Sequence, residues 1–172
     1  AIIEEIWVSN PHPHLADVMG ELASGAGPQE KMRTIERLAG YNKDHEESHL
    51  AIAKAALSAG MWHEAREHLL AAAQIHSSAR VCRYMAELEE AERSDVDASR
   101  EWLRRASIAD PDPAWLCDEC GNAVAEWEPV CGRCEKFDTL EWRIPPRVTR
   151  IDDEIASNPL HGTGQEIIQT LD

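Results

Sequence analysis

Residues 47–75 read ESHLAIAKAALSAGMWHEAREHLLAAAQI, and this stretch decides the fold. Residues 46–59 and 61–75 each place apolar side chains at helical spacing, rich in Ala and Leu. Gly60 separates the two segments, and glycine is the usual residue just beyond the end of a helix. The stretch therefore predicts two antiparallel helices joined by a tight turn.

The spacing of small residues places this hairpin in a repeat. The small or aromatic residues at the expected close contacts are Ala53, Trp62, Ala65 and Ala72. They resemble the pattern of the tetratricopeptide repeat, which has a period of about 34 residues. Residues 79–112 repeat it with Ala86 and Ala98 in the small positions, and residues 12–45 repeat it more weakly, with Met19 and Lys31 there. We therefore expect an all-α, tetratricopeptide-like helical solenoid, with an ordinary antiparallel bundle as the alternative.

Start and stop signals give the remaining helices. These are predicted at residues 14–24, 28–40, 79–92 and 95–107. Pro28 suits a first helical position, Gly40 a stop, and Asp95 an N-cap. Residues 110–113, DPDP, end the helical pattern, so the repeat domain is expected to cover residues 1–112.

The chemistry of the chain is concentrated in residues 115–142, WLCDECGNAVAEWEPVCGRCEKFDTLEW. Two CxxC pairs stand ten residues apart. Two such turns can close a tetrahedral shell of four sulfurs around one metal ion. The predicted ligands are Cys117, Cys120, Cys131 and Cys134, with Gly121 and Gly132 supplying the tight backbone. We expect a small zinc-ribbon (rubredoxin-like) module over residues 113–144.

Closed four-sulfur coordination leaves no position for water, so we expect one structural zinc per chain. The same ligand set also serves a rubredoxin-type iron site, so the sequence leaves zinc and iron open. A dithiol redox site is the third alternative, although the two similar pairs favour a metal over redox chemistry. The fifth cysteine, Cys82, lies in an apolar helical pattern and is expected to be a small core residue. Paired CxxC spacing with an odd total favours a reducing compartment.

Composition and missing motifs argue against several functions. The net charge of −15 would repel a phosphate backbone, and residues 115–143 carry seven acidic and three basic side chains. Nucleic acid and an anionic membrane surface are therefore not expected partners. The eight histidines are scattered and expected to be mostly solvated. Without a phosphate-binding or nucleophile motif, the chain is predicted not to be an enzyme.

The two ends of the chain carry weaker signals. Residues 145–172 show little apolar periodicity, so we expect a mostly disordered tail. Residues 1–8, AIIEEIWV, read like the end of a helix already under way and lack an initial Met. We therefore expect the chain to be part of a longer protein, with any membrane contact made through a missing N-terminal region.

Several segments together resemble a known family. PHPHLADVM, MAELEEAE, REWL and DTLEWR, within residues 5–143, resemble the carboxyl-terminal part of HemY-type proteins of alphaproteobacteria. The resemblance implies a protein with amino-terminal membrane spans and a repeat domain at the cytoplasmic face of the bacterial inner membrane. It also implies a link to late haem (protoporphyrin) biosynthesis, without catalytic residues to carry over.

Two alternatives accompany this resemblance. LapB-type proteins are similar in architecture: they join tetratricopeptide repeats to a rubredoxin-like module and regulate lipopolysaccharide synthesis as adaptors. A haem or porphyrin carrier is the other alternative, although no CxxCH attachment motif is present. A scaffold for protein–protein interaction is the main expectation.

Helical register predicts where a partner protein would bind. In tetratricopeptide repeats the first helix of each pair lines a concave groove. The residues expected to face it are Glu47, Leu50, Lys54, Leu57, Arg80, Arg83 and Glu87. Three of these are cations on an acidic protein, and they could together bind a carboxylate of the partner.

Overall fold

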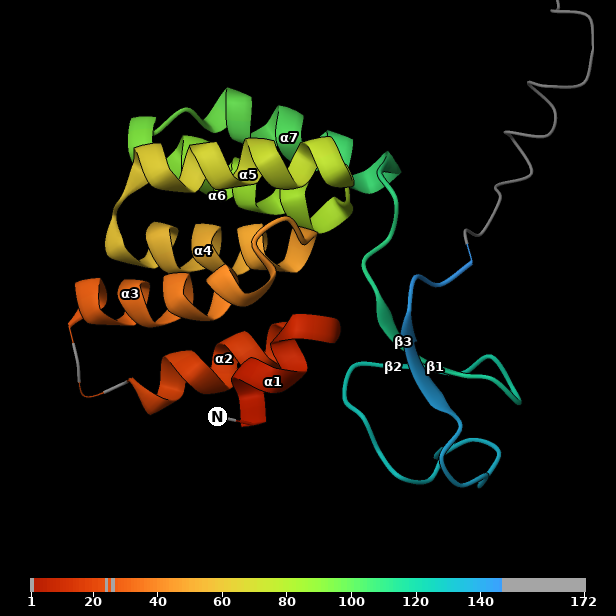
Figure 1. Ribbon diagram of the computed structural model, residues 1–172. Helices are drawn as coiled ribbons and strands as arrows, with labels where there is room; N and C mark the ends of the chain where they lie inside the picture. The colour runs from red at the N-terminus through yellow and green to blue at the C-terminus, as the bar shows by residue number, and fades with distance from the viewer. Residues whose placement is uncertain (1, 24, 26, 147–172) are drawn as a thin grey trace, which may run out of the picture. The chain divides into compact units, whose positions relative to one another are not determined.

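The computed structural model describes residues 2–23, 25 and 27–146 (Figure 1). The chain divides into two compact units, one ending at Pro113 and the other beginning at Ala114. The predicted disordered tail, residues 145–172, lies outside the described residues from position 147 onward.

The described part of the first unit consists of helices, as predicted. They are α1 (Ile2–Ser9), α2 (Pro13–Leu22), α3 (Pro28–Ala39), the 3₁₀ turn η1 (Gly40–Asn42), α4 (Glu46–Ala59), α5 (Trp62–Ile75), α6 (Ala79–Arg93) and α7 (Val96–Ile108). Figure 1 shows α4 with α5 and α6 with α7 as antiparallel pairs stacked in sequence order. No helix in the described part of the chain combines the length and the apolar character that crossing a membrane requires.

The predicted caps explain where several helices begin and end. Pro28 occupies the first turn of α3, and the Asp95 carboxylate accepts a bond from the Ala98 N–H at 2.9 Å. Gly60 adopts a left-handed conformation with φ +71°. Gly40 does end α3, but its φ is −58° and the chain continues into η1, so it terminates the helix without reversing hand.

Two histidines, expected to be solvated, instead cap helices. His12 Nδ1 accepts a bond from the His14 N–H at 3.2 Å before α2, and His45 Nδ1 accepts one from the Glu47 N–H at 3.0 Å before α4. An imidazole nitrogen accepts a hydrogen bond only when it carries no proton. Burial favours the neutral form of each ring: it lowers the pKa of His12 to about 4 and also lowers the pKa of His45. Both histidines therefore have a structural role, as caps at the starts of α2 and α4.

Small buried residues let the helices approach closely. Ala53, Ala65 and Ala72 have no exposed surface, and Ala86 is buried as predicted. In α7, however, the buried small residue is Ser99, and Ala98 is half-buried. α6 has 15 residues where α4 has 14, and this extra residue moves the register of α7 by one position relative to the prediction.

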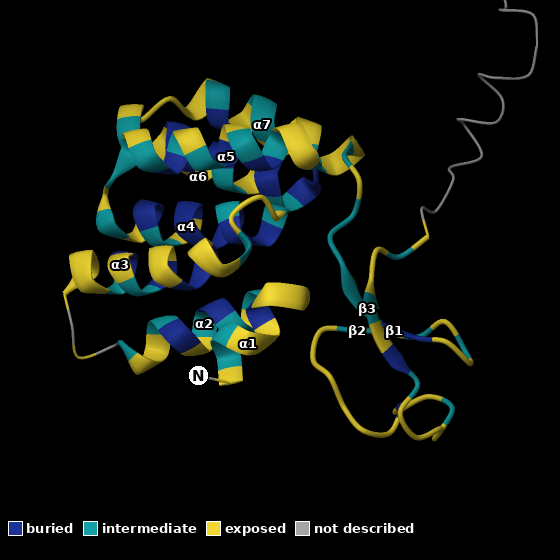
Figure 2. Cartoon of the chain, viewed as in Figure 1, coloured by how far each residue is buried: buried dark blue, intermediate teal, exposed yellow. Residues whose placement is uncertain are grey.

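The second unit contains a three-stranded antiparallel sheet of order β2–β1–β3. Its strands are β1 (Ala114–Cys117), β2 (Ala123–Val124) and β3 (Leu140–Arg143). Trp115 of the central strand pairs with Trp142 of β3, with ring centroids 5.4 Å apart. Figure 2 shows that most of residues 114–146, the described part of this unit, are exposed or half-buried, so side-chain burial alone gives the sheet little stability.

Candidate metal centre

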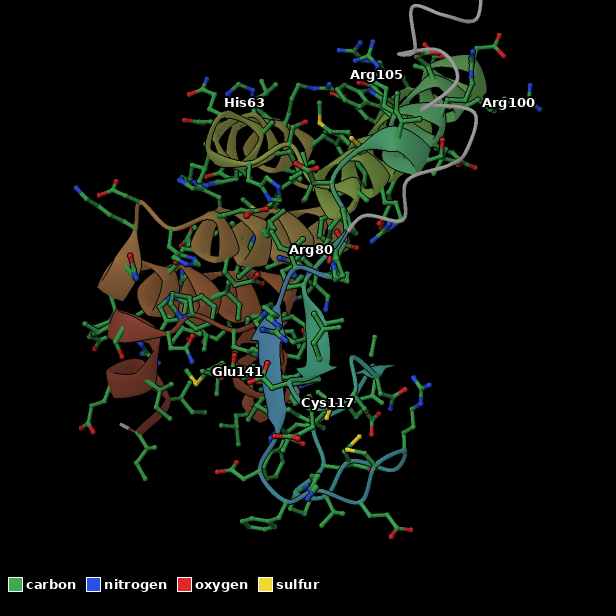
Figure 3. The ribbon with its side chains drawn as sticks, turned by 90° about the vertical axis from the view of Figure 1, so that its right-hand side faces the viewer. His63, Arg80, Arg100, Arg105, Cys117 and Glu141 are labelled. Atoms are coloured by element: carbon green, nitrogen blue, oxygen red, sulfur yellow. The ribbon has the colours of Figure 1, made fainter. Side chains whose placement is uncertain are left out.

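Two loops with matching hydrogen bonds hold the four cysteines. In the first, Cys117 N–H donates to the Asn122 carbonyl at 2.9 Å and Gly121 N–H to the Cys117 carbonyl at 2.8 Å. In the second, Cys131 N–H donates to the Lys136 carbonyl and Glu135 N–H to the Cys131 carbonyl, at 2.9 and 2.8 Å. The two CxxC segments are thus two copies of one turn. Cys117 ends β1, and Figure 3 labels it.

The sulfur positions match tetrahedral coordination. The four Sγ atoms lie within 4.8 Å of one another. Cys117 Sγ is 3.6 Å from Cys134 Sγ, and Cys120 Sγ is 3.8 Å from Cys131 Sγ. A tetrahedron with metal–sulfur bonds of about 2.3 Å has sulfur–sulfur edges of about 3.8 Å, whereas a disulfide is close to 2.05 Å. The geometry is consistent with one metal ion, such as zinc, bound by four thiolates.

The glycine prediction was wrong for the second turn. Gly121 has φ +68°, as a tight turn requires, but Gly132 does not have a positive φ. The matching left-handed residue in the second turn is Glu135, with φ +59°. It directly follows Cys134, the last cysteine of its CxxC, just as Gly121 directly follows Cys120. The left-handed position is therefore the residue after each CxxC, and only the first turn fills it with glycine.

This asymmetry gives a stability prediction. Gly121→Ala is expected to destabilise the loaded module by about 1–2 kcal/mol, because a Cβ is disfavoured at positive φ. Glu135→Gly is expected to stabilise it by up to about 1 kcal/mol, less the extra chain entropy of glycine. Gly132→Ala is the matched control, expected to be neutral. The rate of zinc release to a colorimetric chelator should rise for Gly121→Ala and not for the control; equal rates would contradict the assignment.

The thiol pKa values divide the four cysteines into two pairs: those of Cys117 and Cys131 are lowered, and those of Cys120 and Cys134 are raised. The Thr139 hydroxyl, aided by the Cys120 and Glu119 N–H groups, lowers the pKa of Cys117 to about 6. The Cys134 and Arg133 N–H groups lower the pKa of Cys131. The Asn122 and Lys136 N–H groups also bond to Cys120 and Cys134, but burial and the neighbouring sulfurs outweigh them. The pKa of Cys120 is raised, and that of Cys134 is raised to about 12.

Thr139 supports the site from outside the ligand set, and sequence analysis missed it. Its Oγ1 lies 3.2 Å from Cys117 Sγ. Thr139→Val removes this bond with little change in shape. Loss of such an outer partner typically weakens metal affinity by about 10–100-fold. Competition with a chelator of known affinity should show that loss. Thr34→Val, whose hydroxyl bonds only to its own helix, should retain wild-type affinity. If both variants hold metal equally well, Thr139 has no supporting role.

The fifth cysteine lies apart from this cluster. Cys82 is buried in α6 of the first unit, and burial raises the pKa of its thiol. The His49 and His68 rings, from α4 and α5, hydrogen-bond to each other through their Nδ1 atoms at 2.9 Å. Among the described residues, the four-cysteine cluster is the group that the geometry brings together for metal binding.

The seven residues predicted to face a groove lie in different environments. Leu50 and Leu57 belong to the hydrophobic core, Glu47 is also buried, and Glu87 is exposed. Each of the three cations is paired with an acid: Lys54 with Asp17 at 2.5 Å, Arg80 with Glu47, and Arg83 with Asp112. The expected uncompensated positive patch is therefore a set of ion pairs. Its acids lie 29 to 37 residues away, beyond the reach of local pattern analysis.

A groove does exist in the first unit, but mostly on other residues. It has a volume of about 580 Å³ and lies between α2, α3 and α4. Its lining includes the small residues Ala16, Gly20, Ala51 and Ala55, the cations Lys31 and Lys54, and the acids Asp17 and Glu21. Lys54 is the one predicted groove residue that borders it.

The fold and the cluster together define a tetratricopeptide-like helical-repeat protein with a four-cysteine, zinc-ribbon-like module. No family model matches the chain. The probable magnetosome protein Mms48 of Magnetospirillum gryphiswaldense is 34% identical to it over 142 residues, which are 82% of this chain. The match covers 32% of that protein, so the chain spans about a third of the relative's length.

Proposed function

We propose that the chain is a non-catalytic scaffold that binds a partner protein through its helical repeats, with a structural metal in its second unit. The groove between α2, α3 and α4 carries the proposal. Small residues along its floor leave room for large apolar side chains of a partner. Lys31 at its edge can bind an acidic side chain, whereas Lys54 is already paired with Asp17.

Zinc is the proposed metal, with iron as the alternative. Four thiolates saturate a tetrahedral ion, which leaves no open position for a substrate or a water. The metal would then stabilise the small module and take no part in a reaction. The sulfur geometry supports the proposal of a bound metal, and it suits zinc and iron equally.

The biological setting rests on similarity. The name of the relative, a magnetosome protein, favours a role connected with magnetosomes for this chain as well. The HemY-type resemblance, with its inner-membrane location and its link to haem biosynthesis, rests on sequence segments alone, and so does the LapB-type alternative. Haem carriage gains no support from the histidines described above, since His12 and His45 cap helices and His49 bonds to His68.

A charge reversal in the groove tests the proposal. The double variant Lys31→Glu with Lys54→Glu should abolish the recovery of partner proteins by crosslinking in native membranes. Arg33→Glu with Lys43→Glu is the matched control, because it makes the same charge change at exposed positions outside the groove lining. Ser58→Trp, at the groove edge, blocks it without a charge change. Unaltered melting temperatures are the check on folding. The same partners from all forms would contradict the proposal.

A further inference from the structure

A second hollow, of about 410 Å³, lies in the first unit between α5, α6 and α7. Its apolar lining includes Leu70, Ala73, Cys82, Met85, Trp102 and Ile108. Cys82 and Met85 belong to α6 and are buried, so α6 forms the floor. The volume falls within the range of about 300–1,000 Å³ that small-molecule sites occupy.

Large apolar side chains in the walls of the hollow are exposed to solvent. Leu70 of α5 is 49% exposed and Ile108 of α7 is 72% exposed. The last helix of a repeat array normally turns a polar face to solvent. α7 instead buries only Ser99 and leaves its large apolar residues half-buried or exposed. Clustered exposed apolar groups of this kind commonly mark a binding surface.

One cation stands in this apolar lining. The Arg105 guanidinium lies 4.6 Å from the centroid of the Trp102 ring, which holds it over the hollow's wall. Its ion pair with Glu101 is long, at 3.4 Å, and both side chains are about half exposed, so the pair is weak. A guanidinium has five N–H donors, so Arg105 can still bind a carboxylate. Figure 3 labels Arg105 and, on the same helix, Arg100.

We propose that this hollow binds a small amphiphile with one carboxylate and an unbranched apolar chain, of the fatty-acid class. Arg105 binds the carboxylate, and the chain lies along the α6 floor between Leu70 and Ile108. A peptide is a poorer occupant, because its backbone N–H and C=O groups would find few polar partners: Ser77, Arg105 and the Trp102 indole N–H supply the side-chain hydrogen bonds of the lining.

The net charge of −15 does not prevent this binding. Exposed charges farther away than about 10 Å are largely screened at 0.1 M salt. The helix that carries Arg105, α7, has three basic side chains (Arg100, Arg104 and Arg105) against two acidic ones (Asp97 and Glu101), so this helix itself is not acidic. This site is separate from the groove of the proposed function and stands or falls independently of it.

Calorimetric titration of the full chain with decanoate, below its micelle-forming concentration, tests the proposal. We expect saturable binding of one molecule per chain. Arg105→Gln should weaken it by about 10-fold or more, as expected for a lost charged hydrogen bond. Arg100→Gln, on the same helix but outside the lining, is the matched control and should bind like wild type. Decanol, which lacks the charge, should bind wild type and Arg105→Gln equally.

A filling variant gives a second, independent test. Ala73→Phe places a ring in the hollow and should abolish decanoate binding, and an unchanged helical circular dichroism spectrum would show that the fold is intact. Absence of saturable decanoate binding to the wild-type chain would overturn the proposal. So would equal affinity of the wild type, Arg105→Gln and a folded Ala73→Phe variant.

Discussion

Stripping the metal from the chain is expected to unfold residues 114–143 and to leave the helical unit folded. The strands of this module are short and few of its side chains are buried, so most of its stability must come from the metal. Structural zinc contributes on the order of 10 kcal/mol to the folding of small modules. Chelation should therefore remove amide protection from the module, while the circular dichroism signal of the helices changes little.

The same result is expected from replacing ligands. Cys120→Ser with Cys134→Ser removes one sulfur from each CxxC turn and should reduce the metal content from about one ion per chain to none. Cys82→Ala is the matched control, because Cys82 belongs to the helical unit. Elemental analysis of the purified proteins measures the outcome. Metal retained by the double variant, or lost from Cys82→Ala, would refute the assignment of ligands.

Breaking the ion pair between Arg80 and Glu47 is expected to cost the helical unit about 3–5 kcal/mol. The pair links α6 to α4, with Nη1–Oε1 at 3.3 Å, and only 17% and 9% of the two side chains are exposed. Arg80→Met leaves the buried Glu47 carboxylate without its cation, and such a loss typically costs this much. Urea unfolding followed by helical circular dichroism measures it.

Two companion variants separate pairing from packing. Arg83→Met breaks the more exposed pair with Asp112 and should cost at most about 1 kcal/mol. Arg80→Met with Glu47→Leu replaces both buried charges by apolar groups and should recover most of the loss. Equal costs for Arg80→Met and Arg83→Met would show that burial does not set the value of these pairs.

The cost of Arg80→Met should also depend on pH. Burial raises the pKa of Glu47 even with Arg80 in place. An acid with a higher pKa in the folded state binds protons first in that state, so acidification favours folding through that group. Without Arg80 the pKa rises further. The deficit of Arg80→Met is therefore expected to be largest near neutral pH and to shrink as the pH is lowered and Glu47 takes up a proton.

The helices could be predicted because their signals are local. Apolar spacing, Gly60 and Asp95 act within one or two turns, so the predicted boundaries lie within about two residues of those observed. The four cysteine ligands could be predicted equally well, because the spacing of the two CxxC pairs already indicates one cluster. The register of α7 could not be predicted, because a single extra residue in α6 moved the buried small position from Ala98 to Ser99.

Features that depend on tertiary contacts could not be predicted. The bond between Glu47 and Arg80 joins residues 33 positions apart, so register alone suggested that both faced a partner-binding groove. Thr139 approaches Cys117 only after β3 pairs with β1. Glu135 carried no signal, because a left-handed residue other than Gly, Asn or Asp is rarely anticipated from sequence.

X-ray absorption spectroscopy at the metal edge of the purified full chain tests the four-sulfur site most directly. A closed structural zinc centre predicts a zinc edge with four sulfur neighbours at about 2.3 Å and no oxygen or nitrogen in the shell. A shell with fewer than four sulfurs, or with a bound oxygen, would contradict the closed site. So would purified protein whose CxxC cysteines form disulfides and hold no metal.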